Sequence, residues 1–363
     1  MFAVRSSQFA VRHFCLVLTV ISLAALCFLY HYAGIDSYWV DELYTVSAIR
    51  SSFSFSDTVK IYSSVDVNAP LYHFIAYFWY RLVPHTEQAL KTLSIILSLL
   101  ACIVTGMTGK KMHSAKTGLL AFLFILASRI MLINSAFQFR PYSMLLLAAA
   151  LTLYFYLARL KHETWTNIVL YGVTMCLLPY SHYVAVFICF GLFIADCVLI
   201  LRKRSRPRII VSYFLGALLF LPWLYLMLAS RSITNDFGFF HPKVPAFKDI
   251  VSVCKWLVGA HSVMDIPFWL TLCGMFFVLR EAYKLLAAHE KFSDEIIFLC
   301  ACIFSSAFMI LSVFIKIYAR IPLALAIGRK RAYSFLFCYN SCHPFNELRF
   351  AGWPDKNVLS VKS

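Results

Sequence analysis

Two adjacent acidic residues, Asp41 and Glu42, follow the first apolar run of the chain. A carboxylate in such a place can remove a proton from a substrate group, so both are candidate catalytic residues. Neighbouring positions on a helix point about 100° apart, so the two carboxylates cannot act as one symmetrical pair. We expect one of them to face a cavity and the other to be tied to the scaffold. The alternative is a solvated acidic pair at a helix N-terminus, where the helix dipole favours negative charge.

An arginine that could bind an anion, Arg140, stands at the end of a long apolar run and is followed by Pro141. Its planar guanidinium group can hold a phosphate through two parallel hydrogen bonds. An arginine at the end of a membrane helix faces either the interior of a helix bundle or a polar headgroup. The alternative is therefore a side chain that extends to lipid headgroups. Pro141 suits the first turn of the helix that follows.

Further candidate substrate-binding residues lie near the ends of apolar runs, on the side where we place Asp41: Asp66, Tyr72, His73, Tyr142, His182 and Tyr183. Together with Arg140 they provide groups that can bind an anion and move a proton. A single histidine at a membrane interface, such as His182, is more often structural. The histidines show no local spacing of the kind H-x-x-x-H, so the sequence specifies no cofactor and leaves only a divalent metal ion open.

The composition indicates what kind of protein positions these residues. Hydrophobic residues make up 61% and charged residues 14% of the 363 residues, whereas average proteins have roughly 45–50% and 25%. So few charges cannot cover a soluble surface, and the balance also excludes a disordered chain, a coiled coil and a small secreted disulfide scaffold. It predicts an all-α polytopic membrane protein. The 12 cysteines form no C-x-x-C pair and lie mostly inside apolar runs, so we interpret them as small apolar residues.

Nine apolar runs are candidate transmembrane helices: residues 14–32, 90–107, 117–133, 142–158, 167–178, 183–201, 209–228, 266–279 and 296–317. Some are short, but tilt and polar ends are tolerated. The first run has the position of a signal peptide, but its length and the lack of an obvious cleavage site favour an anchor. The sequence thus predicts a bundle of about nine transmembrane helices.

Basic residues occur in short clusters between these runs and give the chain a formal net charge of +16. Because they do not form one amphipathic face, no nucleic-acid partner is expected. They indicate loops that are retained in the cytoplasm. All clusters fall on one side if residues 70–83, which are rich in tyrosine, form a helix along the outer surface instead of a span. This topology places the N-terminus inside.

The same topology leaves two large outer loops, at about residues 33–88 and 229–265. Long loops in compact proteins tend to be functional or disordered, and the aromatic and apolar spacing of the first predicts an ordered segment. We expect residues 1–320 to form one transmembrane domain. Residues 321–363 change character, with a basic triplet and a polar tail, and resemble an out-of-frame or truncated ending more than a domain.

Four motifs, in this order, resemble the GT-C superfamily of membrane glycosyltransferases. They are most similar to the dolichyl-phosphate-mannose protein mannosyltransferases, a group that includes the lipid A aminoarabinose transferase. The motifs are the acidic pair at 41–42, a D-x-H-P-P-L-Y-Y type motif at 66–73, an R-P-Y-[SA]-L type motif at 140–144 and a Y-[ST]-H-Y motif at 180–183. Asn68 and Ala69 depart from the His-Pro of the second motif.

The resemblance implies a glycosyltransferase that moves a sugar, with inversion, from a polyprenyl-phosphate donor to a lipid, glycan or protein acceptor. In that case Arg140 would stabilise the leaving phosphate, and Asp41 would be the base for the acceptor hydroxyl. The donor would be anchored in the bilayer, and the site would face outward from the membrane. The short loops favour a bacterial inner membrane.

Other membrane proteins share this composition. A transporter or flippase of a lipid-linked or polar solute would usually show a repeated hydropathy pattern or broken helices near the midplane. A membrane phosphatase or acyltransferase would need a local nucleophile or a histidine–carboxylate arrangement, which the sequence does not show. We therefore take the glycosyltransferase as the main hypothesis and the transporter as its alternative.

Overall fold

The computed structural model describes residues 2–35, 37–64, 68–128, 130–201 and 205–230, and the statements below concern these residues. They all belong to the first of two compact units, Met1–Ser312 and Val313–Ser363. The expected spans at 266–279 and 296–317, nearly all of the outer loop at 229–265 and the tail from 321 lie outside the described residues. Within the described part every regular element is a helix, which confirms the all-α class.

Four helices contain segments long and apolar enough to cross a membrane: α1 (Phe2–Ala33), α5 (Glu87–Met112), α7 (Tyr142–Lys161) and α10 (Ile210–Ser230). Three shorter helices occupy further expected runs: α6 (Ala115–Leu126), α8 (Trp165–Ser181) and α9 (Val186–Leu201). These helices confirm a polytopic membrane protein. The predicted total of about nine spans extends beyond the described residues and stays a prediction.

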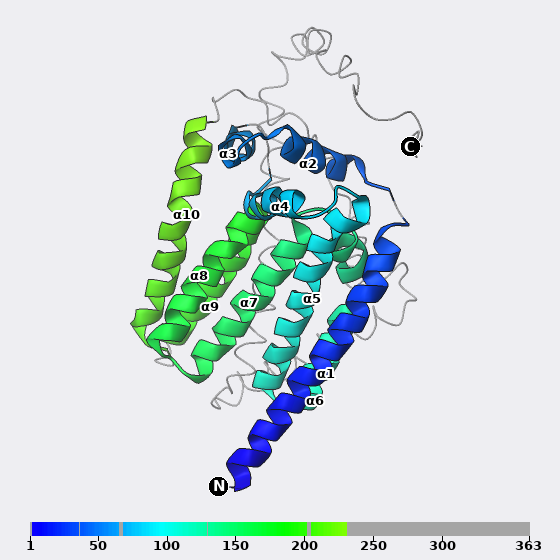
Figure 1. The fold of residues 1–363 in the computed structure, drawn as a ribbon. Coiled ribbons are helices and arrows are strands. Elements are labelled where there is room, and N and C mark those ends of the chain that lie inside the picture. Colours follow the sequence, from blue (N-terminus) through cyan, green and yellow to red (C-terminus); the bar gives the residue numbers. More distant parts are fainter. Residues whose placement is uncertain (1, 36, 65–67, 129, 202–204, 231–363) are drawn as a thin grey trace, which may run out of the picture. The chain divides into compact units, whose positions relative to one another are not determined.

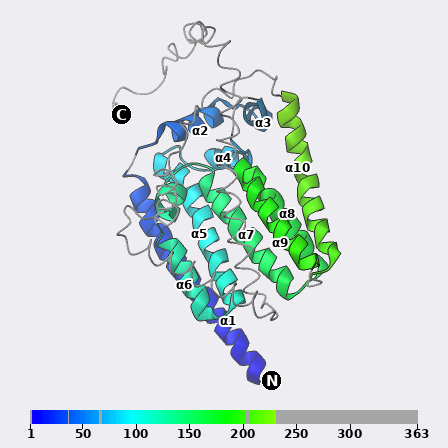
Figure 2. The ribbon, with the colours of Figure 1, turned by 180° about the vertical axis from the view of Figure 1, so that it is seen from behind.

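The membrane helices pack side by side in the order α1, α5, α7, α8 and α10 (Figure 1). Helix α6 packs on α5 and α1, and α9 packs on α8 (Figure 2). A small residue allows the α5 and α6 backbones to approach closely, because a Cβ atom on Gly118 would lie 2.5 Å from the carbonyl oxygen of Gly106. Close approach at small residues is typical of helix packing in membranes.

The third expected span, residues 117–133, is not one continuous helix. Helix α6 ends at Leu126, and a short π-helix, η1 (Ile130–Ala136), follows it. The Ser128 hydroxyl accepts a hydrogen bond from the backbone N–H of Met131 at 3.2 Å, so a side chain caps the new segment. Serine side chains compete with helical hydrogen bonds in this way. The prediction of a single helix over this run is therefore wrong. The short π-helix ends at Ala136, shortly before Arg140 in the chain.

Three further helices lie across one end of the membrane helices: α2 (Val40–Ser51), α3 (Phe55–Ser64) and α4 (Leu71–Leu82) (Figure 1). Helix α4 has 12 residues. That length corresponds to about 18 Å and cannot cross the roughly 30 Å hydrocarbon core of a bilayer. The guanidinium of Arg81 donates to the carbonyl oxygen of Ser52 at 2.8 Å, which fixes the α2–α3 link on α4. Residues 71–82 thus form a short helix in an ordered layer across the end of the bundle, and their position outside the bilayer core stays a prediction.

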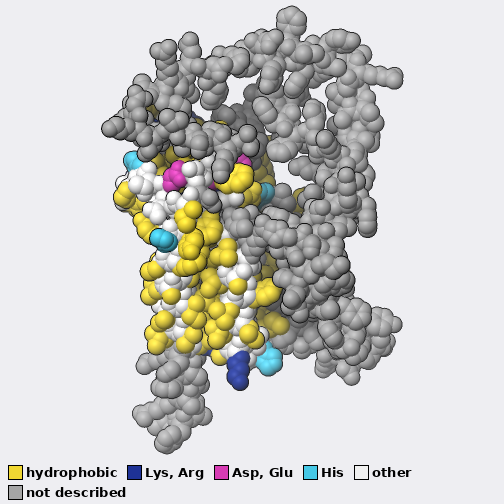
Figure 3. Space-filling model, turned by 90° about the vertical axis from the view of Figure 1, so that its right-hand side faces the viewer, with side chains coloured by type: hydrophobic (Ala, Val, Ile, Leu, Met, Phe, Trp, Pro, Cys, Tyr) yellow, Lys and Arg dark blue, Asp and Glu magenta, His cyan; other side chains and the backbone are white. Residues whose placement is uncertain are grey.

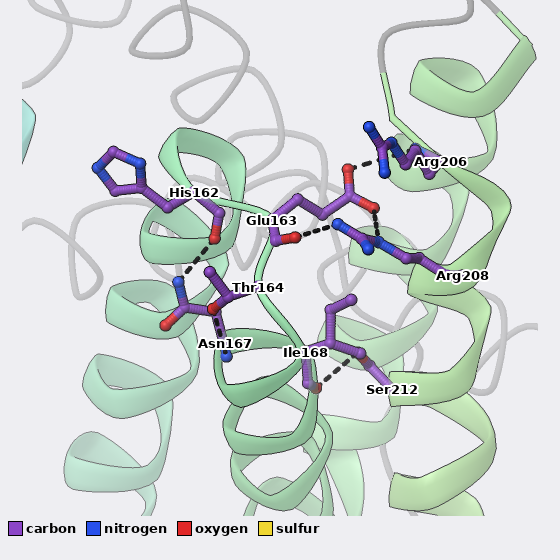
Figure 4. Close-up of polar contacts among 8 residues, drawn as sticks. All are labelled: His162, Glu163, Thr164, Asn167, Ile168, Arg206, Arg208 and Ser212. Carbon is purple, nitrogen blue, oxygen red and sulfur yellow. Dashed lines mark hydrogen bonds and ion pairs between the residues drawn. The ribbon is translucent and has the colours of Figure 1, made fainter.

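The opposite end of the bundle gathers basic residues. Lys161 Nζ donates to the carbonyl oxygen of Lys111 at 2.7 Å and so ties the end of α7 to the end of α5. The Glu163 carboxylate accepts from Arg208 Nε at 2.8 Å and from the Arg206 backbone N–H at 3.4 Å (Figure 4). On the face drawn in Figure 3, acidic side chains lie near the end that carries α2 to α4, and Lys or Arg side chains lie at the other. The described basic clusters therefore share one end, as the topology predicted.

A buried ion pair between Arg159 and Asp196 joins α7 to α9 near the basic end, and 1% of each side chain is exposed. The Tyr213 hydroxyl on α10 donates to Oδ2 of Asp196 at 2.5 Å, and the Arg159 guanidinium lies 4.3 Å from the ring centre of Tyr156. Ionisable groups inside membrane proteins are costly and are usually paired. This cluster, which we call the α7–α9 ion pair, links three helices of the bundle.

Candidate active site

Glu42 is fully buried in the first turn of α2 and ties this helix to the segment before α7. One carboxylate oxygen accepts from the backbone N–H of Phe139 at 2.5 Å, and the other accepts from that of Trp39 at 2.9 Å. Burial raises the pKa of Glu42, against the opposing effects of these two N–H groups and of Lys91. Because both oxygens already accept backbone hydrogen bonds, this geometry favours a scaffold role for Glu42.

Asp41, the preceding residue, forms an ion pair with Arg140. Its Oδ2 lies 2.9 Å from Nη1 of Arg140, and 64% of the Asp41 side chain is exposed against 23% for Arg140. Arg140 directly follows Phe139, which is the residue that Glu42 holds. The hydrogen bond between Glu42 and Phe139 therefore helps to bring Asp41, the expected base, next to Arg140, the expected anion-binding residue.

Tyr142 and His182 lie beside this arginine. The guanidinium carbon of Arg140 lies 4.9 Å from the centre of the Tyr142 ring. The rings of Tyr142 and His182 are stacked, with their centres 6.3 Å apart. Burial, and then the charge of Arg140, lower the pKa of His182, which favours the neutral imidazole. The start of α7 and the end of α8 thus supply the groups around the guanidinium.

Tyr72 and His73, on α4, are buried among other side chains. The Tyr72 hydroxyl shares a hydrogen bond with that of Ser94 at 2.8 Å and so fixes α4 to α5. The His73 ring is stacked on Tyr62 with centres 4.0 Å apart, and no described residue forms a hydrogen bond with either ring nitrogen. Burial, with a smaller effect of Arg140, lowers the pKa of His73 to about 3, so the ring is neutral at physiological pH.

Tyr183 links the second motif to α10. Its hydroxyl donates to the carbonyl oxygen of Asn68 at 3.3 Å and accepts from the indole N–H of Trp223 at 3.0 Å. Asp66, two residues before Asn68, lies outside the described residues, so its substrate-binding role stays a prediction. Among the residues that the structure describes, no group of three or more His, Cys, Asp or Glu side chains could hold a metal ion. The divalent metal also stays a prediction.

Three residues near the site were not predicted from the sequence: Tyr62, Lys91 and Trp223. Lys91 is buried in α5, its charge acts on Glu42, and its Nζ lies 5.3 Å from the ring centre of Tyr38. A lysine at the start of an apolar run was the available signal, because a cation in such a place needs a partner. Tyr62 and Trp223 belong to no motif, and only tertiary packing brings them to the site.

The arrangement combines a proton acceptor and an anion-binding cation at the end of a membrane helix bundle. Asp41 is exposed enough to meet a hydroxyl group, and Arg140 contacts it through Nη1. Guanidinium groups bind phosphates preferentially through two N–H groups. The site is therefore suited to a reaction in which a hydroxyl loses a proton and a phosphate carries away charge.

The part of the chain that contains Arg140 and His182 is similar to a known protein family. Residues 67–226 match the family model described as dolichyl-phosphate-mannose-protein mannosyltransferase. The match contains the motifs at 140–144 and 180–183 and begins after Asp41 and Glu42. No curated protein matches the chain. The family match confirms the resemblance to the GT-C superfamily of membrane glycosyltransferases.

Proposed function

We propose that this GT-C-type membrane glycosyltransferase transfers a sugar from a polyprenyl-phosphate donor to a hydroxyl group of its acceptor, with inversion. The observation that carries the proposal is the contact between Asp41 and Arg140 at one end of the membrane helices. A lipid-linked donor keeps its tail in the bilayer, so its phosphate reaches the site at the membrane surface. The acceptor is a lipid, a glycan or a protein.

In the proposed reaction the acceptor oxygen attacks the anomeric carbon of the sugar. Its proton passes to the Asp41 carboxylate, and the bond between the anomeric carbon and the phosphate oxygen breaks. The polyprenyl phosphate leaves with the bonding electrons, and Arg140 stabilises the charge that develops on it. Glu42, Tyr142 and His182 hold these two groups in position.

We place the site at the outer face of the membrane, because the described basic clusters lie at the opposite end of the bundle. Lysine and arginine are retained in cytoplasmic loops. The short loops favour the inner membrane of a bacterium.

The proposal is tested with the full chain in nanodiscs and a panel of polyprenyl-phosphate sugars. The measurement is the release of polyprenyl phosphate in the presence of membrane extract as the source of acceptors. Arg140→Lys keeps the charge but loses the planar fork, so release should fall at least about tenfold. Arg50→Lys, on the exposed last turn of α2, is the matched control and should behave as wild type.

Two outcomes would contradict the proposal. Equal rates for wild type and Arg140→Lys would show that bidentate phosphate binding is not used. If wild-type protein consumed no donor but moved a polyprenyl-phosphate sugar across the bilayer, the chain would act as a flippase instead.

A further inference from the structure

We propose that in the resting enzyme Asp41 occupies the place of the donor phosphate on Arg140, and that donor binding releases Asp41 to act as the base. The inference rests on the proposed function and adds an order of events to it. The donor must bind first, because until then the base is held by the cation that the donor needs.

Inverting transfer requires space between the base and the leaving group. The base and the leaving group act on opposite faces of the anomeric carbon, so a sugar ring and an acceptor oxygen must fit between them. In inverting glycosidases the two acting carboxyl groups are about 6.5–9.5 Å apart for this reason. Asp41 Oδ2 lies only 2.9 Å from Arg140 Nη1. The observed ion pair therefore has to open before the reaction can take place.

The Asp41 carboxylate is a weak competitor for Arg140. The Asp41 carboxylate is 64% exposed and contacts the guanidinium through Nη1. Exposed ion pairs of this kind contribute little and are weakened by salt. The donor phosphate is a diester with two free oxygens, which can bind two guanidinium N–H groups at once, whereas the Asp41 carboxylate contacts Nη1. A donor phosphate can therefore displace the carboxylate.

The surroundings of Asp41 allow its carboxylate to move while helix α2 and Arg140 stay in place. Glu42 anchors the first turn of α2 through the backbone N–H groups of Trp39 and Phe139. The Tyr142 ring lies 4.9 Å from the guanidinium carbon and supports it without Asp41. Release thus requires only a change of side-chain rotamer at Asp41, and the freed carboxylate remains at the site.

The exchange predicts that removing the base improves the binding of a lipid phosphate at Arg140. Asp41→Asn removes the competing charge, so a polyprenyl monophosphate in nanodiscs should bind roughly two- to fivefold more tightly than to wild type, as expected from the worth of an exposed ion pair. Asp41→Ser removes the same charge with a shorter side chain and should behave alike, which guards against a variant that fails to fold.

Asp57→Asn is the matched control for the loss of one negative charge from the same helical layer. Asp57 lies in the first turn of α3, where its carboxylate accepts hydrogen bonds from the backbone N–H and the hydroxyl of Ser54, and it takes no part in the Asp41–Arg140 ion pair. Its affinity for the polyprenyl monophosphate should equal that of wild type. Unchanged or weaker binding by both Asp41 variants would overturn the inference, and so would equal tightening in the Asp57 variant.

Arg140→Gln separates this inference from the proposed function. If Arg140→Gln loses the polyprenyl monophosphate but neither Asp41 variant tightens, Arg140 is the phosphate site and the exchange is wrong. If Arg140→Gln binds as well as wild type, the phosphate role of Arg140 fails and the proposed function fails with it.

Discussion

Asp41 and Glu42 are neighbours in sequence with different surroundings. Helical geometry turns adjacent side chains to different directions, and here one meets backbone N–H groups while the other meets a guanidinium. The base role of Asp41 came from the family resemblance, whereas the helical spacing predicted only that the two carboxylates differ in surroundings, not which of them is tied to the scaffold. That depends on the contact between Glu42 and Phe139, which are far apart in the chain. A tertiary hydrogen bond of this kind leaves no signature in either local segment.

The two residues should therefore fail in different ways when they are changed. Asp41→Asn keeps the shape of the side chain and removes its basicity, so the rate of sugar transfer should fall by roughly two to four orders of magnitude. The apparent melting temperature in detergent should stay that of wild type, because this side chain is largely exposed. Transfer rates with a fixed donor and thermal melts together check the prediction.

Glu42→Gln is the companion variant and should behave in the opposite way. Its amide N–H₂ group would face one of the two backbone N–H donors that now contact the carboxylate. A buried donor left without an acceptor costs about 1–3 kcal/mol, so the melting temperature should drop. If Glu42→Gln melts as wild type but is inactive, and Asp41→Asn is active, the base is Glu42.

At the scale of helices, the apolar runs predicted most elements well. Length and hydropathy are strong signals for spans, and the tyrosine-rich run at 70–83 was correctly predicted to form a helix. The run at 117–133 was predicted as a single helix, and one local polar signal near its interruption is Ser128, whose hydroxyl accepts from the backbone N–H of Met131. Single-residue effects of this kind are too weak to outweigh a long apolar pattern.

The topology can be tested with cysteines introduced at exposed positions of the described helices. His85→Cys lies on the link between α4 and α5, whereas Lys116→Cys and His162→Cys lie at the other end of the bundle. An impermeant thiol reagent on intact cells should add label to the first variant only, relative to the parent chain. The other two should react after permeabilisation. Labelling of Lys116→Cys from outside would show that α4 spans or that the chain is inverted.

At the scale of the described bundle, polar groups concentrate at its two ends, and the α7–α9 ion pair is a buried exception. Arg159 and Asp196 were not predicted to be partners. The sequence places Arg159 in a basic cluster with Lys161, and it places Asp196 as an isolated acidic residue within an apolar run. Burial of both is evident only once α7 and α9 are packed. The sequence therefore predicted the polar groups at the ends of the bundle, but it did not predict which polar groups form ion pairs in the interior of the bundle.

The last prediction separates the stability supplied by this pair from the activity of the site. Arg159→Met leaves the buried Asp196 carboxylate without its cation, and breaking a buried pair in this way costs about 3–5 kcal/mol. The apparent melting temperature should fall strongly.

The double variant Arg159→Met with Asp196→Leu removes both charges at similar volume, and such replacements are often neutral or stabilising, so it should recover most of the loss. From residue 142 to residue 159 helix α7 extends over about 25 Å, so the affinity of the folded double variant for a polyprenyl monophosphate should equal that of wild type. A single variant as stable as wild type would show that the pair does not hold the bundle together. A stable double variant with weakened phosphate binding would show instead that the charges act on the site at a distance.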